Sequence, residues 1–357
     1  MTPSEVLNLR LHNQQIAQTN YSQPKQIVSW MVAMQAQEYA MAKWAIGLRL
    51  SGVVDLDIED AFNQGKILRT HVMRPTWHFV CPEDIRWLLE LTANRVNAVN
   101  AFMYRKCELD KDIFGICSNL IEKLLEGGRY VTRDEFNKAF EQRGIFSDGV
   151  RLSLIMMHAE LEGLICSGPR SGNQFTYALL DERVPKTVSI NREEALAKLS
   201  NSYYASRGPA TLHDFVWWSG LTMKDAIEGA SLLKSDFVKE KINGKEYIFK
   251  VQSSETINGT QTSFLMPDYD EYGISYKDRS ALFGDSQNPV SNNSDISYNR
   301  MMVVNGRIVG SWKRTIKNKE VIIQTASFGK LDEAGQKAIL EASLRYSAFL
   351  GKTMSFT

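Results

Sequence analysis

The sequence predicts an α+β fold in which groups of helices each end in a two-stranded ribbon. Three observations lead to this prediction. Helical patterns are followed by short runs rich in strand-forming residues, this order recurs three times, and glycines or Asn-Gly pairs punctuate each group. The chain has 357 residues, of which 43% are hydrophobic and 23% charged, as in soluble proteins of two to four domains.

The composition also bounds the compartment. No apolar run reaches the roughly 18 residues of a membrane span, and the N-terminus lacks a basic region followed by an apolar core. The four cysteines are widely spaced and form no CxxC pair. We therefore expect a cytoplasmic protein with reduced thiols and no membrane association.

The first group of elements occupies residues 1–109. Thr2, Pro3 and Glu5 fit a capping box, and Pro24 is placed to start the next helix. Helices are expected at residues 3–13, 24–34, 38–50 and 57–64, and strands at 67–72 and 77–81. Pro75 marks the turn between these strands, and Pro82 begins another helix.

The second group, residues 110–188, repeats the order. Helices are expected at 112–125, 133–142 and 148–161, the second of them after a capping box from Thr132 to Glu135. Strands at 164–167 and 174–179 then flank a tip at 168–173.

The third group, residues 189–260, has helices at 192–206, 211–218 and 222–233 and strands at 238–242 and 246–251 around Asn243-Gly244, a strong hairpin signal. Residues 252–260 form a polar linker. Helices followed by a two-stranded ribbon is winged-helix (helix-turn-helix) order, so three such modules are expected in tandem. Trp217 and Trp218 fit this third module, although they are equally typical of plain core.

The remaining residues, 261–357, predict a C-terminal mixed α/β region. Its expected elements are a hairpin of strands 301–304 and 307–312 at Asn305-Gly306, a strand at 320–325 and a helix at 331–350. Residues 284–297 are rich in Ser and Asn, which is typical of a mobile loop.

Gln35 and Gln37 form an unusual pair after the apolar face of the second helix. Residues two apart point to different faces of a helix but can share a side of extended backbone, so the helix must break if the two amides act together. Two amides can fix a water without carrying charge, which suits hydrolysis of an activated leaving group. The alternative is a helix end with solvated amides.

Three further stretches follow the Gln35-Ala36-Gln37 motif. They read RTHVMRPTWHFV (69–80), LMPDYDEY running on to YKDR (265–272 and 276–279) and VNGRIVGSW (304–312). Together the four stretches resemble the AlkZ-like winged-helix DNA glycosylases, and the resemblance spans nearly the whole chain. It implies excision of bulky alkylated bases or unhooking of interstrand crosslinks, and a catalytic role for Gln35 and Gln37.

The YcaQ-type relatives carry Gln-x-Asp where this chain has Gln35 and Gln37. Strong general-base catalysis from position 37 is therefore not expected. An N7- or N3-alkylated purine is a cationic leaving group, for which placing the water can suffice. Glu38 is a competing candidate, but a solvated carboxylate is the simpler interpretation.

The expected partner is double-stranded DNA with alkylated bases or crosslinks, bound by a monomer. The candidate DNA-binding residues are basic or aromatic and lie in or beside the motifs and turns: Arg69, Arg74, Trp77, His78, Arg170, Lys277, Arg279, Lys313 and Arg314. The alternatives are core packing for Trp77, a hydrogen-bonded structural role for His78 and solvated faces for the lysines. Asp268 and Asp270 favour a structural ion-pair network.

No cofactor or metal is expected, because His71 and His78 lack further ligands in an HExxH or Cys-rich pattern. The net charge of +1 requires any basic face to arise by segregation in space. Two other functions stay open. One is a winged-helix transcription regulator without catalysis, and the other is a protein that binds a small molecule.

Overall fold

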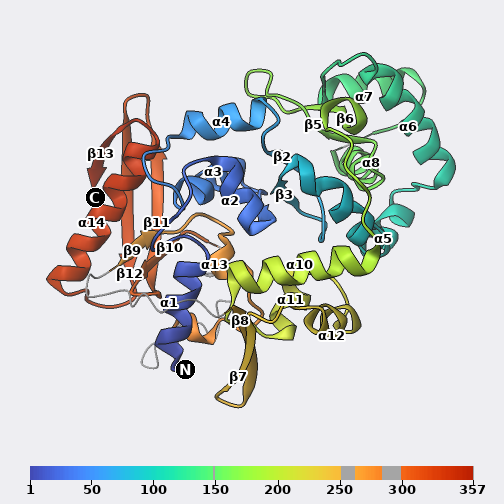
Figure 1. The fold of residues 1–357 in the computed structure, drawn as a ribbon. Helices are drawn as coiled ribbons and strands as arrows, with labels where there is room; N and C mark the ends of the chain where they lie inside the picture. Colours follow the sequence, from blue (N-terminus) through green and yellow to red (C-terminus); the bar gives the residue numbers. More distant parts are fainter. Residues whose placement is uncertain (148, 251–261, 284–298, 357) are drawn as a thin grey trace.

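The computed structural model describes residues 1–147, 149–250, 262–283 and 299–356 (Figure 1). The linker expected at 252–260 and the loop expected at 284–297 lie outside these residues. Helices and short strands alternate as the sequence predicts, so the fold is mixed α and β. No helix in the described part of the chain is both long and apolar enough to cross a membrane.

The first group of elements forms a small sheet flanked by helices. The elements are α1 (Pro3–Asn13), α2 (Pro24–Met31), β1 (Ala33–Gln35), α3 (Tyr39–Gly47), α4 (Asp55–Asn63), β2 (Leu68–His71) and β3 (Trp77–Val80). Strand β3 lies between β1 and β2, antiparallel to both. The expected ribbon is therefore confirmed, and β1 is an additional strand on its edge.

Two helices of this group are shorter than expected. α2 ends at Met31 and not at residue 34, because Val32 has a φ of +61°, which stops the helix. α3 ends at Gly47, three residues before the predicted end. The break after α2 is the one that the Gln35 and Gln37 pair requires.

The second group repeats this topology. After the 25-residue helix α5 (Pro82–Lys106), it contains α6 (Lys111–Leu125), β4 (Val131–Thr132), α7 (Arg133–Gln142), α8 (Gly149–Leu161), β5 (Ile165–Ser167), β6 (Thr176–Leu179) and α9 (Leu180–Arg183). The last strand again lies in the middle, in the order β4-β6-β5. The Thr132 capping box is present.

The third group is α10 (Arg192–Arg207), α11 (Leu212–Ser219), α12 (Met223–Ser231), β7 (Phe237–Ile242) and β8 (Lys245–Lys250). Ala210 forms an antiparallel bridge with Ile248 of β8, at the place where β1 and β4 stand in the first two groups. The same connection of helices and ribbon therefore occurs three times in the described residues.

The C-terminal region is a five-stranded sheet with a long helix beside it (Figure 1). Its order is β13 (Thr353–Phe356), β12 (Glu320–Ser327), β11 (Arg307–Ile316), β10 (Met301–Val304) and β9 (Ser263–Leu265). α14 (Glu333–Phe349) packs along β9, and α13 (Glu271–Ile274) and a short 3-10 helix (Ser280–Leu282) precede β10. The hairpin, the third strand and the helix were predicted; β9 and β13 were not.

Buried apolar side chains form two clusters. One joins α5 to the second and third groups, and the other joins most of the first group to the C-terminal sheet. The β1 strand stands between them, since Ala33 belongs to the first cluster and Met34 to the second. Gln35 therefore follows a segment fixed on both sides by core.

Candidate active site

Gln35 is the last residue of β1 and pairs with His78 of β3. The next residue, Ala36, donates its N–H to the Trp77 carbonyl at 2.7 Å, which extends the pairing by one residue. Gln37 follows and is exposed, while Gln35 is half-buried. The Gln-x-Gln segment is thus extended backbone on the edge of a sheet and not a helix end.

A buried carboxylate holds Gln35 from the other side. Glu271 accepts the Gln35 backbone N–H at 2.9 Å, and its second oxygen accepts from Arg207 at 2.9 Å and from the Ser275 hydroxyl at 2.6 Å. The Trp218 indole N–H donates to the same oxygen at 3.0 Å. Burial raises the pKa of Glu271, but Arg207 and these hydrogen bonds outweigh it and lower the pKa to about 2.

Arg69 fixes the two carbonyls that follow Gln35. Its Nε donates to the Ala36 carbonyl at 2.9 Å, and an Nη donates to that of Gln37 at 3.4 Å. The guanidinium lies between the rings of Trp77 and Phe175, 4.1 and 4.6 Å from their centroids. Burial lowers its pKa to about 10, so it is charged at neutral pH. The Gln-x-Gln backbone is therefore held by groups from three parts of the chain.

A cavity of about 370 Å³ lies at Gln35. Its walls come from the β2–β3 turn, α5, the end of α11 and the segment before α13: Gln35, Met73, Arg74, Pro75, Thr76, Arg95, Val96, Val99, Gly220, Tyr269 and Ile274. Gln37 is not one of the lining residues. The structure thus places only one of the two glutamines in this cavity wall.

Arg74 orients the Gln35 amide. One of its Nη atoms donates to Gln35 Oε1 at 3.3 Å and lies 3.5 Å from His78 Nε2. His78 donates from Nδ1 to the Thr76 carbonyl at 2.9 Å, which makes Nε2 the acceptor. Burial and the neighbouring Arg74 lower the pKa of His78 to about 3, so the ring is neutral near pH 7.

The other residues predicted to bind DNA lie outside the cavity at Gln35, in separate parts of the fold. Arg170 stacks on Phe175 at 4.0 Å and on Tyr39 at 5.2 Å, close to Arg69. Arg279 donates to the Gly273 carbonyl and lies over Trp217, whereas Lys277 is exposed in a different cavity beside Asp214.

Lys313 is exposed on β11, and the neighbouring Arg314 donates to the Tyr346 hydroxyl. Glu38 and Asp268 are among the charges that act on Arg314, although burial is the main cause of its lowered pKa. Arg314 of β11 is therefore within electrostatic reach of Glu38, the residue after Gln37.

Asp268 and Asp270 form the expected ion pairs. Asp270 accepts two hydrogen bonds from Arg49, both at 2.9 Å, with both side chains fully buried. Asp268 accepts from Arg300 at 2.9 Å. His71, in turn, binds Glu160 of α8.

Sequence reasoning missed several residues of the site. Glu271 stood inside the quoted stretch LMPDYDEY, but its long-range contact with Gln35 had no local signal. Arg207, Arg95 and Gly220 were not singled out either. A clue for Gly220 was its place between two helices, where a left-handed residue is common.

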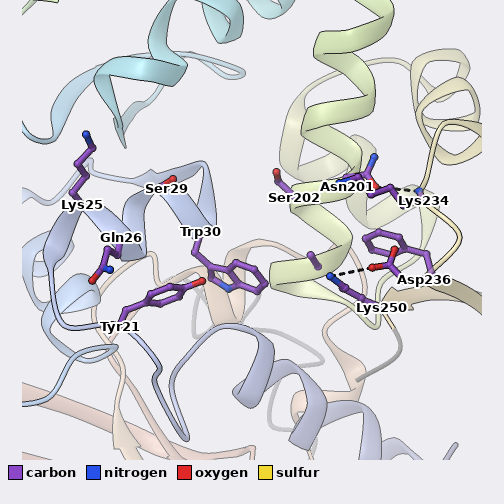
Figure 2. A pocket seen from close by; sticks show the side chains of 12 residues that line it. Tyr21, Lys25, Gln26, Ser29, Trp30, Asn201, Ser202, Lys234, Asp236 and Lys250 are labelled. Carbon is purple, nitrogen blue, oxygen red and sulfur yellow. Dashed lines mark hydrogen bonds and ion pairs between the residues drawn. The ribbon is translucent and has the colours of Figure 1, made fainter. Parts of the chain in front are cut away.

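A separate cavity of about 470 Å³ lies between α2 and α10 (Figure 2). Tyr21 and Trp30 form one wall, Asn201 and Ser202 of α10 the other, and Lys250 pairs with Asp236 at 3.0 Å. Asn201 and Ser202 point about half a turn away from Arg207, the α10 residue that binds Glu271. This cavity is therefore separate from the one at Gln35.

Comparisons with known proteins agree with this geometry. A curated interstrand DNA cross-link repair glycosylase from Streptomyces sahachiroi is 21% identical over 342 residues, which is 89% of each chain. The solved structure of the Streptomyces sahachiroi DNA glycosylase AlkZ superimposes with a TM-score of 0.79 over the full length of both chains, at 17% identity. The model of the family described as DNA glycosylase AlkZ-like matches residues 28–349. The chain therefore belongs to the AlkZ-like family of DNA glycosylases.

Proposed function

We propose that the protein hydrolyses the N-glycosidic bond of N7- or N3-alkylated purines in duplex DNA and unhooks interstrand crosslinks, with a water positioned by Gln35 and Gln37. The observation that carries this proposal is the Gln35-Ala36-Gln37 segment, which Glu271, Trp77 and Arg69 hold in extended backbone with Gln35 in the wall of a cavity. The Streptomyces sahachiroi relative that acts on interstrand cross-links supports the crosslink substrate.

The chemistry follows from the groups around Gln35. An amide oxygen has two lone pairs, so the hydrogen bond from Arg74 leaves room for one from a water. Water adds to C1′ as the C1′–N bond breaks, the bonding electrons neutralise the cationic purine, and the proton leaves to solvent. His78 is buried and neutral, and Glu271 is buried with a pKa of about 2, which makes either a poor base. The site therefore suits a leaving group that is already activated, in a monofunctional reaction without a cofactor.

The repeated topology supports three winged-helix modules. We assign them to residues 1–109, 110–188 and 189–260, followed by the C-terminal region at 261–357. In each, the last strand lies between the ribbon's first strand and an edge strand or bridge. In this arrangement a monomer surrounds the duplex.

We assign different roles to the predicted DNA-binding residues according to how deeply each is buried. Arg69 and His78 are buried and serve to hold the Gln-x-Gln segment and Arg74. Arg74 and Trp77 are half-buried beside them, and Lys313 is exposed on the β11–β12 hairpin, where it can meet phosphates. The remaining proposed DNA contacts lie farther from Gln35 and are Arg170, Lys277, Arg279 and Arg314.

Base release from duplexes tests the proposal. With an N7-alkylguanine monoadduct or a nitrogen-mustard crosslink under single-turnover conditions, Gln35→Ala and Gln37→Ala should each slow release about 100-fold or more, because a positioned polar group is lost. Duplex affinity and unfolding should stay near wild type, and Gln142→Ala, an exposed glutamine of α7, serves as the matched control.

Two results would contradict the proposal in different ways. If Gln35→Ala and Gln37→Ala both kept full activity, the two glutamines would not position the water. Tight duplex binding by the wild type without any release would point to a DNA-binding regulator instead.

A further inference from the structure

The C-terminal half of α5 has an exposed face that leads away from the Gln35 cavity. Its residues follow one another at spacings of four, three and four positions, so their side chains lie on one stripe of the helix. They are Arg95, Val99, Phe102 and Lys106, and we call this face the α5 stripe. All four residues are exposed, Val99 to 57% and Phe102 to 65%.

The α5 stripe begins at the cavity. Arg95 and Val99 are among the residues that line it, and Arg95 donates to the Gly220 carbonyl at 3.4 Å. Phe102 and Lys106 lie about one and two turns beyond Val99. At about 1.5 Å per residue, Lys106 is roughly 16 Å from Arg95 along the helix axis, which is the length of about five base-pair steps. The stripe therefore spans several base pairs from the place where the lesion would bind.

The charge of this part of α5 is complementary to DNA. Residues 91–107 include three basic residues and neither Asp nor Glu, in a chain whose net charge is only +1. A carboxylate of α8, Glu162, accepts a hydrogen bond from Asn97 at 3.1 Å. Asn97, however, lies on the side of the helix opposite to the stripe. The stripe is therefore a basic surface segregated in space, which a polyanion would favour.

Phe102 distinguishes the stripe from an ordinary solvated helix end. Arg105 and Lys106 lie in the last turn of α5, where cations stabilise the helix dipole without any partner. A phenyl ring has no such role, and the opposite face of α5 already packs, with Tyr104 against Phe114 at 5.2 Å. Apolar side chains among cations are typical of surfaces that enter a groove of DNA and contact its sugars and bases.

We propose that the α5 stripe is a docking surface for duplex DNA, on which Phe102 packs against sugars and base edges and Lys106 lies at a phosphate. The inference rests on the proposed function, because it takes the Gln35 cavity as the place where the lesion binds. The stripe then holds the stretch of duplex that leaves this cavity. It binds DNA with or without a lesion, so it contributes affinity and leaves the chemical step to the groups at Gln35.

Duplex affinities of Phe102→Ala and Lys106→Ala test this surface. Lys106→Ala should weaken binding and lower the slope of log affinity against log salt by about 1, because one phosphate contact is lost. Phe102→Ala should weaken binding about 10-fold and leave the slope unchanged, because an apolar contact releases no counterion. Both losses should be equal for duplexes with and without an N7-alkylguanine. The maximal single-turnover rate of base release should stay within about twofold of wild type.

Matched variants elsewhere control for the loss of a ring or a charge. Phe146→Ala removes a phenyl ring that is 68% exposed, and Lys123→Ala removes an exposed lysine from the last turn of α6. Neither variant should change duplex affinity or its salt slope. Because Phe102 and Lys106 are exposed, their own variants should unfold near the wild-type temperature.

The docking surface and the proposed function can fail separately. If wild type binds duplex and releases no base, the proposed function is wrong, while the affinities of the variants still decide the surface. If wild type releases base and Phe102→Ala and Lys106→Ala bind duplex as tightly as wild type, the α5 stripe does not hold DNA. A wild-type dimer that Phe102→Ala converts to a monomer, with duplex affinity unchanged, would make the stripe a contact between two copies of the chain.

Discussion

Glu271 and His78 are buried titratable side chains next to Gln35, and each keeps one charge state at neutral pH. Glu271 stays ionised because Arg207 and its hydrogen-bond donors lower its pKa to about 2 despite burial. His78 stays neutral because burial and Arg74 lower its pKa to about 3. The polar groups of the site are therefore fixed in charge, as a preorganised site requires.

The His78 pKa predicts how stability depends on pH. The unfolded chain binds a proton at this histidine below about pH 6.5, whereas the folded chain does so only near pH 3. Above about pH 6.5, His78 is neutral in both states, and the folded protein keeps its full unfolding free energy. As the pH falls from 6.5 toward 3, the unfolded chain gains a proton that the folded chain cannot bind, and the unfolding free energy decreases. Lowering the pH from 7.5 to 5.0 should cost about 2 kcal/mol of unfolding free energy through this residue.

Urea unfolding at the two pH values measures this loss. His78→Asn should show a smaller loss between pH 7.5 and 5.0 than wild type, whatever its absolute stability. His213→Asn, at an exposed position of α11, is the control. Equal losses in wild type and His78→Asn would show that His78 is not the titrating group.

At the scale of the element, the β2–β3 turn carries Arg74 and depends on close packing against α5 and α11. The Met73 N–H is donated to the Thr92 hydroxyl of α5 at 3.1 Å, and Met73 itself has a φ of +61°. Gly220, after α11, lies against the Met73 carbonyl with its own φ at +70°. This contact sets the position of the turn and hence of Arg74 over Gln35.

Gly220→Ala should disturb that contact. A Cβ at this position would lie under 3.0 Å from the Met73 carbonyl oxygen, on a backbone conformation that disfavours any side chain. We expect a loss of about 1–3 kcal/mol in unfolding free energy and slower base release. Gly115→Ala, in the interior of α6 where a Cβ meets nothing within 4 Å, should be neutral or stabilising. If Gly220→Ala and Gly115→Ala had the same stability and the same rate of base release, the contact between Gly220 and Met73 would not set the position of the turn.

At the scale of the whole molecule, a net charge of +1 has to be reconciled with a polyanionic substrate. Much of the basic charge is neutralised internally, as in the buried pairs Arg49–Asp270 and Arg207–Glu271. The cations that reach phosphate are therefore few, and the position of each one matters.

Lys313 should be one of these cations. Lys313→Ala is expected to weaken duplex binding and to lower the slope of log affinity against log salt by about 1. Lys234→Ala removes an equal charge from an exposed lysine of the separate cavity and should leave the slope unchanged. Titrations of duplex DNA with wild type and both variants at several salt concentrations measure these slopes. An unchanged slope in Lys313→Ala would place the β11–β12 hairpin away from the duplex.

The sequence could predict what local chemistry determines. The capping boxes at Thr2 and Thr132 and the Asn243-Gly244 and Asn305-Gly306 turns located helices and hairpins to within a few residues. The motif at Gln35 and Gln37 implied a break in the helix, and the break is there.

Non-local features were out of reach. β1 has three residues and continues an apolar run, so only its pairing with β3 defines it. The contact between Gln35 and Glu271 joins residues 236 positions apart, and no local pattern encodes such a contact. The burial of Arg69 could not be predicted either, because an exposed strand arginine and a buried one look alike in sequence.

The distance along the chain between Gln35 and Glu271 also has a consequence for synthesis. At about 5–20 residues per second, the ribosome delivers Glu271 some tens of seconds after Gln35. During that interval the Gln35 N–H lacks the acceptor that the finished protein provides, and Arg207 emerges before its carboxylate partner. The nascent chain therefore completes the surroundings of Gln35 only after about three quarters of the protein have been made, so a chain that ends before Glu271 would carry the glutamines without their support.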